Sequence, residues 1–167
     1  MSKSTQEPPK EELDLVYICD VKSKPIDWLW PGYLAKGKLS LVVGHPGQGK
    51  STLTASIAAI VSSGGVWPVS EAPVPAGDVV ILSAEDDIAD TLRPRLEAAG
   101  ADIERVRVLK GVKRASRTHS FSLVKDIERL RGLSADLLII DPISSYLDGI
   151  DTHKNAEVRS TLEPLCL

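Results

Sequence analysis

One stretch of the chain has the residue types and spacing of a phosphate-binding loop. It fits the pattern G-x-x-x-x-G-K-[ST], is followed by Thr52, and reads Gly44-His45-Pro46-Gly47-Gln48-Gly49-Lys50-Ser51. Glycines let successive backbone N–H groups turn inward around an anion, and a helix starting near Lys50 adds the positive end of its dipole. In this pattern the lysine ammonium reaches the β- and γ-phosphates, and the hydroxyl of Ser51 binds Mg²⁺. We therefore predict an ATP site at residues 44–52; the alternative is a glycine-rich turn without a ligand.

An aspartate lies where such a site would need its metal ligand. Asp141 directly follows four apolar residues, 137–140, which are typical of a strand buried on both faces. The carboxyl end of a parallel strand is where open α/β sheets bind their ligands. We predict that Asp141 holds Mg²⁺ through a water, as a Walker B aspartate does. The alternative is an aspartate that caps the turn before Pro142.

A third acidic position is a candidate general base. Many ATPases place a water-activating glutamate directly after the metal aspartate, but here Pro142 follows Asp141. Glu85 lies at the carboxyl end of a predicted strand at 79–82, on the edge that should carry Asp141, and could polarise an attacking water. Alternatively, Asp86 and Asp87 cap the next helix and Glu85 only adds charge to its first turn. The two interpretations are compatible.

Alternating apolar runs and helical patterns supply the elements that position these residues. Strands are predicted at 39–43, 79–82, 106–109 and 137–140, and helices at 50–62, 87–99, 123–130 and 155–163. Pro94 should kink or interrupt the second helix. This alternation predicts an α/β fold, a mainly parallel sheet with helices on both faces. Residues 15–18 are expected to form a short edge strand, and the polar residues 1–14 a disordered lead-in to one domain at 15–167.

Composition narrows the class of protein. The chain has 167 residues, 43% of them hydrophobic and 26% charged, as expected for one soluble globular domain. Its net charge of −3 argues against a surface that binds polyanions everywhere, but allows a local basic patch. No run of 18 apolar residues and no apolar leader occurs, so no membrane partner and a cytoplasmic location are expected. Cys19 and Cys166 are too isolated for a disulfide framework or a zinc site.

Taken together, these motifs resemble a known family. The chain is similar to RecA-like P-loop ATPases of the RepA type, AAA-annotated proteins that include hexameric replicative helicases. The resemblance spans roughly residues 28–165 and rests on the phosphate loop (Walker A) together with Trp30-Pro31-Gly32, Gly37-Lys38-Leu39, Ser83-Ala84-Glu85-Asp86, Arg93-Pro94-Arg95-Leu96 and Ile140-Asp141-Pro142-Ile143-Ser144-Ser145-Tyr146. It implies that Glu85 is the catalytic base. It also implies a homo-oligomer, often a ring, that binds ATP between subunits and has single-stranded DNA as a candidate partner.

The resemblance also implies that part of the domain lies outside this chain. Family members continue into a further strand, which usually lies between the phosphate-loop strand and the Walker B strand, and then to an arginine finger. Here the chain ends at Leu167. The expected fold is thus a RecA-like domain without its C-terminal strands, with two strand edges left unpaired.

The predicted function is Mg·ATP binding, with hydrolysis driving DNA replication or a helicase-type motor in the full-length protein. In that reaction Lys50 and Mg²⁺ offset the developing charge, and Glu85 orients the water. A small-molecule P-loop kinase and a non-hydrolysing nucleotide-binding fragment are the alternatives.

Two weaker signals remain open. Six cations and no acid occur within 105–117, which favours a solvated loop over a contact with DNA phosphates. Trp28 and Trp30 could stack on an adenine, but are better explained as apolar anchors of the N-terminal segment.

Overall fold

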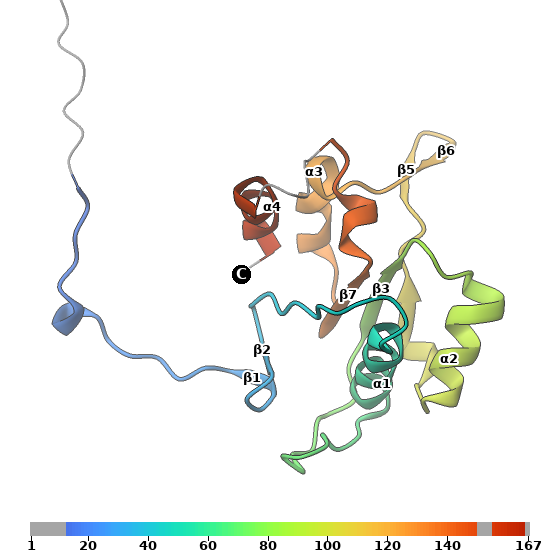
Figure 1. Ribbon diagram of the computed structural model, residues 1–167, viewed down its shortest axis with the longest axis horizontal. Coiled ribbons are helices and arrows are strands. Elements are labelled where there is room, and N and C mark those ends of the chain that lie inside the picture. The colour runs from blue at the N-terminus through green and yellow to red at the C-terminus, as the bar shows by residue number, and fades with distance from the viewer. Residues whose placement is uncertain (1–12, 150–154, 166–167) are drawn as a thin grey trace, which may run out of the picture.

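A short parallel sheet forms the centre of the molecule. The computed structural model describes residues 13–149 and 155–165, so most of the predicted lead-in at 1–14 lies outside the described residues. The sheet has the strand order β4-β3-β7, from β3 (Val79–Ser83), β4 (Val106–Val108) and β7 (Leu137–Asp141). Helices α1 (Lys50–Ser63) and α2 (Arg93–Ala98) lie on one side of it, and α3 (Leu123–Asp126) and α4 (Asn155–Leu162) on the other (Figure 1). The predicted α/β architecture with a parallel sheet is confirmed.

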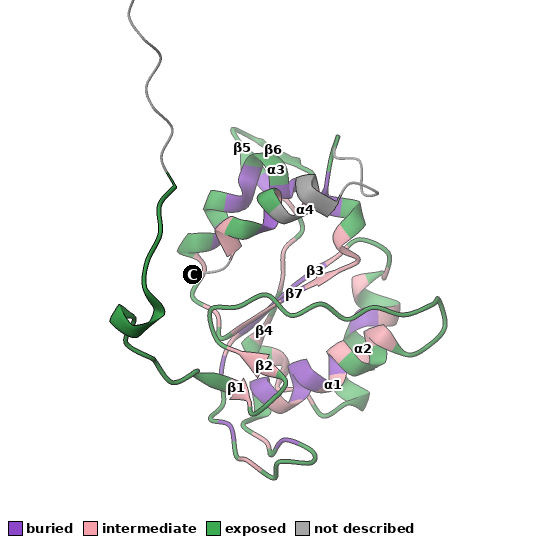
Figure 2. Cartoon of the chain, turned by 60° about the vertical axis from the view of Figure 1, so that its left-hand side comes forward, coloured by how far each residue is buried: buried purple, intermediate pink, exposed green. Residues whose placement is uncertain are grey.

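Strand β3 carries the core on both of its faces. Val79 and Ile81 pack into a cluster with α1 and α2, whereas Val80 and Leu82 pack into a second cluster with α3 and the segments around it. Side chains alternate between the faces of a strand, so this central strand is buried on both sides. Figure 2 colours each residue by its burial. The second cluster includes the 3₁₀ segments η4 (Ile127–Gly132) and η5 (Ile143–Tyr146).

Local signals set the ends of the first two helices. Helix α1 follows Gly49 and stops at Gly64, both in the left-handed conformation that glycine adopts without strain. The carboxylate of Asp87 accepts hydrogen bonds from the backbone N–H groups of Ala89 (2.7 Å) and Asp90 (3.1 Å), which caps the next helix. That helix begins as a π-helical turn, η2 (Ile88–Leu92), and becomes α2 just before Pro94. The predicted interruption is therefore present.

The predicted strand at 39–43 does not form. These residues make no strand, and Leu41 and Val43 remain 67% and 80% exposed. A strand needs a neighbour that accepts and donates its backbone hydrogen bonds, and the nearest sheet edge, β7, lies across an open cleft. This cleft has a volume of about 500 Å³ and is lined by residues 36–42 on one side and 137–143 on the other. We call it the β7 cleft.

The same cleft explains a second correction. Strand β7 was expected to be buried on both faces, but only Ile139 is buried and its other four residues are half-buried. Among the described residues β7 pairs with β3 alone, so its second edge faces the β7 cleft. A central position in the sheet is needed to bury a strand completely, and β7 does not have one here.

Several short elements complete the fold. Strands β1 (Trp28–Trp30) and β2 (Leu34–Ala35) pair antiparallel, as do β5 (Val112–Arg114) and β6 (Arg117–His119). The 3₁₀ turn η3 (Ile103–Arg105) leads into β4, and a second one, η6 (Glu163–Leu165), follows α4. The expected edge strand at 15–18 is wrong, because these residues are exposed, have no partner strand in the described chain, and lead into a 3₁₀ turn, η1 (Ile18–Asp20). None of the described helices is long and apolar enough to cross a membrane.

Trp30 packs against the body of the domain and anchors the N-terminal segment, which is the interpretation that the sequence favours over stacking on an adenine. Its ring stacks on that of Trp67 with centroids 4.8 Å apart, and the indole N–H of Trp67 donates to the carbonyl of Leu29 at 2.6 Å. Trp28 is 38% exposed and lies in the same short strand. The β1–β2 unit is thereby fixed to the loop that follows α1.

Candidate functional site

The phosphate loop is closed by its own side chains. The ammonium of Lys50 donates to the carbonyl oxygens of Gly44 (2.8 Å) and His45 (2.9 Å), and the N–H of His45 donates to the side-chain oxygen of Gln48 (2.9 Å). Gly47 and Gly49 have φ angles of +78° and +79°, which only glycine adopts without strain. The loop therefore has the backbone turns that let successive N–H groups point toward one anion, and the Lys50 ammonium lies beside them.

Lys50 uses acceptors that a nucleotide would replace. The two carbonyl oxygens hold an exposed ammonium in place, and the phosphates of a nucleotide would offer it stronger, charge-assisted partners. Of the other predicted loop residues, Pro46 lies within this closed turn, and Ser51 and Thr52 lie in the first turn of α1. All of the predicted residues 44–52 thus lie in one compact segment at the start of α1.

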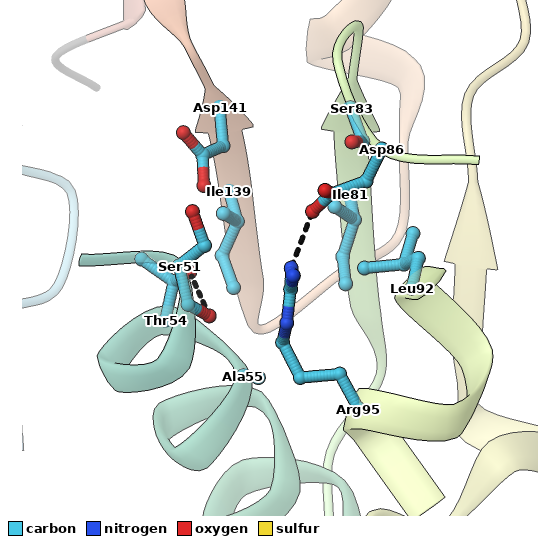
Figure 3. Close-up of a pocket in the computed structure, with 10 residues that line it drawn as sticks. All are labelled: Ser51, Thr54, Ala55, Ile81, Ser83, Asp86, Leu92, Arg95, Ile139 and Asp141. Atoms are coloured by element: carbon cyan, nitrogen blue, oxygen red, sulfur yellow. Dashed lines mark hydrogen bonds and ion pairs between the residues drawn. The ribbon is translucent and has the colours of Figure 1, made fainter. Parts of the chain in front are cut away.

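Sheet register brings the predicted metal ligands to the same place. Ser83 on β3 lies opposite Asp141 on β7, and the N–H of Ala84 donates to the carbonyl of Asp141 at 3.2 Å. Ser51, in the first turn of α1, lines the same small cavity as Asp141. Figure 3 shows the Ser51 hydroxyl and the Asp141 carboxylate on the same side of this cavity. Two residues 90 positions apart in the sequence therefore meet at the carboxyl edge of the sheet.

The donors present suit a magnesium ion. A hydroxyl and a carboxylate are hard oxygen ligands, and Mg²⁺ is usually held by one or two carboxylates with water and phosphate oxygens. Within the described residues no group of three or more His, Cys, Asp or Glu side chains could enclose a metal by itself. Ser51 and Asp141 thus fit a metal that is completed by a nucleotide better than they fit an independent metal centre.

Glu85 occupies a different position from its neighbour. Glu85 is exposed at the carboxyl end of β3 and does not line the cavity that contains Ser51 and Asp141. Asp86 does line it, and its carboxylate forms an ion pair with the guanidinium of Arg95 from α2. Of the two aspartates considered as helix caps, Asp87 is the cap, since its carboxylate receives the backbone N–H bonds.

Sequence reasoning missed three contributors to this cavity, Thr54, Ser83 and Arg95. Thr54 carried no signal beyond its place one turn after Ser51 in α1. Ser83 stood within a motif that supported the family resemblance, but its place beside Asp141 depends on the register of β3 and β7. Arg95 stood within a motif that supported the family resemblance, but its contact with Asp86 depends on how α2 packs against β3.

Hydrogen bonding and burial shift the pKa values of two side chains around the site. Backbone N–H bonds from Ala89 and Asp90 lower the pKa of Asp87, which keeps the cap ionised. Burial, and then the charge of Asp141, raise the pKa of Tyr146, which follows β7 in η5. The Tyr146 phenol is therefore neutral and serves as a core residue.

The basic segment at 105–117 is partly neutralised. Arg105 and Arg107 lie within 3.5 Å of Asp78 carboxylate oxygens, and Arg114 lies 2.7 Å from Asp126. The remaining cations of the segment, Lys110, Lys113 and Arg117, are exposed and have no ion-pair partner among the described residues. The favoured interpretation of a solvated loop remains a prediction.

A serine hydroxyl that follows a glycine loop lies beside the aspartate at the end of a parallel strand. This arrangement is typical of the P-loop class of nucleotide-binding domains. Residues 6–166 match the family of AAA domains. Since this match spans nearly the whole sequence, the chain belongs to that family of nucleotide-binding ATPases. No curated protein matches the chain.

Proposed function

We propose that the chain is the Mg·ATP-binding part of a RecA-like ATPase of the RepA type. The observation that carries this proposal is the position of Ser51 and Asp141, which share one cavity directly after the Lys50 loop. These two residues would hold a metal beside a nucleotide whose phosphates occupy the loop, and the metal would supply neutralisation of phosphate charge. The AAA family membership supports the ATP part of this proposal.

Each site residue has one task in the proposed reaction. The ammonium of Lys50 leaves the loop carbonyls and binds the phosphates, where it offsets charge that develops on the transferred group. Ser51 and Asp141 would hold Mg²⁺, which supplies further neutralisation of that charge. Glu85, exposed at the same edge of the sheet, orients a water for attack on the γ-phosphate.

The β7 cleft supports the finer assignment to RecA-like ATPases. Residues 39–42 on one wall are mostly apolar and form no strand, and β7 on the other wall has no partner strand on this side in the described chain. We infer that one more strand lies between them in the complete ATPase. The complete protein would then be a cytoplasmic homo-oligomer, a ring that hydrolyses ATP to act on single-stranded DNA in replication or as a helicase.

Thermal melting with and without saturating Mg·ATP tests the nucleotide site. A ligand that binds only the folded state, at 100 times its Kd, stabilises the fold by about 2.7 kcal/mol. We expect this shift in the natural chain and in Lys125→Ala, which removes an exposed lysine elsewhere, and its loss in Lys50→Ala. The absence of a shift in the natural chain, or an equal shift in Lys50→Ala, would contradict the proposal.

The fate of the γ-phosphate separates the proposed ATPase from its alternatives. An ATPase releases inorganic phosphate without an acceptor, whereas a P-loop kinase needs a small-molecule acceptor and a binding module consumes no ATP. Phosphate release that rises with single-stranded DNA would support the motor assignment. Binding without any ATP consumption would leave only the nucleotide-binding alternative.

A further inference from the structure

A second pair of charges lies beside the candidate metal ligands. Arg95 from α2 and Asp86 after β3 line the cavity that also contains Ser51 and Asp141, and Figure 3 shows the guanidinium pointing up toward the Asp86 carboxylate. Both side chains are largely withdrawn from solvent, with 29% and 25% of their surfaces exposed. This ion pair therefore stands at the site and not on the outer surface.

The backbone holds Asp86 in this place from both sides. Ala84 is bonded to the carbonyl of Asp141, and Asp87 caps the following helix with two hydrogen bonds. Asp86 lies between these fixed points and cannot move far from the end of β7. Its charge is thus a permanent part of the surroundings of Asp141.

Helix α2 offers a contrast within two residues. Arg93 pairs with Glu97 at 2.9 Å, but these side chains are 64% and 48% exposed and do not line the cavity. Exposed pairs of this kind are screened by water and contribute little. The Arg95–Asp86 pair is less exposed to solvent. Loss of either partner would therefore leave an unpaired charge that water screens only weakly, with a strong effect on neighbouring groups.

We propose that Arg95 and Asp86 set how tightly the site holds its metal, by cancelling one another's charge beside Ser51 and Asp141. This inference rests on the proposed function, because the metal is the Mg²⁺ that accompanies ATP. Arg95 is a positioning residue: it keeps the Asp86 carboxylate neutralised and turned toward α2. Without Arg95 the bare carboxylate would attract the metal, and without Asp86 the bare guanidinium would repel it.

The test is a titration of Mg²⁺ into the chain in the presence of a fluorescent ATP analogue, which reads binding and needs no turnover. From Coulomb's law for one unpaired charge near a divalent ion, we expect Asp86→Asn to raise the half-saturating Mg²⁺ concentration about three- to tenfold. Arg95→Gln should lower it by a similar factor. Arg95→Lys, which keeps the charge, should stay within about twofold of the natural chain.

Opposite shifts distinguish a charge effect from a structural one. If the pair only stabilised the fold, Asp86→Asn and Arg95→Gln would weaken metal binding together, and that result, or no change in either, would overturn the inference. Arg93→Gln, which breaks the exposed pair on the same helix, should leave the titration unchanged. If Arg95→Gln does not fold, Asp86→Asn and Arg95→Lys still decide, because weaker binding in the first with natural binding in the second is required.

Failure of the proposed function would look different. In that case the natural chain would bind no nucleotide analogue at any Mg²⁺ concentration, and the inference would fall with it. Nucleotide binding that depends on Mg²⁺ but is indifferent to Asp86 and Arg95 would overturn the inference alone.

Discussion

The two edges of strand β7 belong to the same residues, but only one of them is paired with another strand in the described chain. Along one edge, all five residues of β7 pair in register with β3, from Val79 opposite Leu137 to Ser83 opposite Asp141. The other edge faces the β7 cleft, and the apolar residues 39–43 across that cleft form no strand. An apolar sequence favours a strand, but only a neighbouring chain that completes its hydrogen bonds makes it one.

This difference bears on the nucleotide site. The metal side of the site is built from α1 and the paired edge, which fix Ser51 and Asp141. The start of the phosphate loop, at Gly44, instead follows the unpaired segment 39–43. The metal side of the site is therefore well packed, whereas the position of the start of the phosphate loop depends on what fills the β7 cleft.

Amide hydrogen exchange should show the largest contrast. Alternate residues of a strand direct their N–H groups to opposite edges, so those of β7 that face the cleft lack a protein acceptor in the described chain. We expect them to exchange on the order of a hundredfold faster than the N–H groups in the centre of β3, which has strands on both sides. Uniform protection along β7 would show that the cleft edge is covered.

One substitution made on each side should give the next largest contrast. Leu82 on β3 is fully buried, so Leu82→Ala should lower the free energy of unfolding by about 2–5 kcal/mol. Leu41 in the cleft wall is 67% exposed, so Leu41→Ala should change it by less than about 0.5 kcal/mol. Urea unfolding of both variants measures the difference, and equal losses would mean that the cleft is filled in solution.

The buried carboxylate of Asp126, in the packed helical layer on one face of the sheet, should make the free energy of unfolding depend on pH. Burial alone would raise the pKa of Asp126, but hydrogen bonds from Arg114, the Ser122 backbone and Arg129 outweigh it and lower that pKa. Stabilisation from such a group is complete above the ordinary aspartate pKa, about 4, and is lost as the pH falls through the lowered value. We expect Asp126→Asn to cost about 1.5–3 kcal/mol at pH 7 and less below pH ~4.

Unfolding free energies of the two chains, compared between pH 3 and pH 7, measure this effect. Other carboxylates titrate in the same range, but they are common to both chains and cancel in the difference. A cost of the substitution that does not depend on pH would show that the bonds to Asp126 do not depend on its charge.

The sequence predicts those parts of the fold whose partners are implied by its own pattern. Residues 79–82 and 137–140 form strands because each has the other beside it, and α1 follows from the loop and its apolar face. The hairpin of β5 and β6 could not be foreseen, since its two-residue turn places Ala115 at a φ of +53°, where a glycine or asparagine is the usual signal.

The candidate site divides in the same way. Ser51 and Asp141 could be brought together from the sequence, because the carboxyl ends of parallel strands share one edge with the phosphate loop. The ion pair of Asp86 and Arg95 could not be predicted, since the two residues lie nine positions apart across loop and helix and only the packing of α2 decides which way Arg95 points. The order of strands and helices thus predicts which ends of elements meet, but not the direction of a side chain that depends on helix packing.

The aromatic stack at the far end of α1 has a practical consequence for spectroscopy. The chain has three tryptophans, and Trp28, Trp30 and Trp67 all lie at or next to the contact between β1 and the loop after α1. Helix α1 has 14 residues, so its length, about 20 Å, separates Trp67 from Lys50 at the phosphate loop. The intrinsic tryptophan fluorescence of this protein should therefore report whether its N-terminal segment is docked. It should not respond to a nucleotide bound at the phosphate loop.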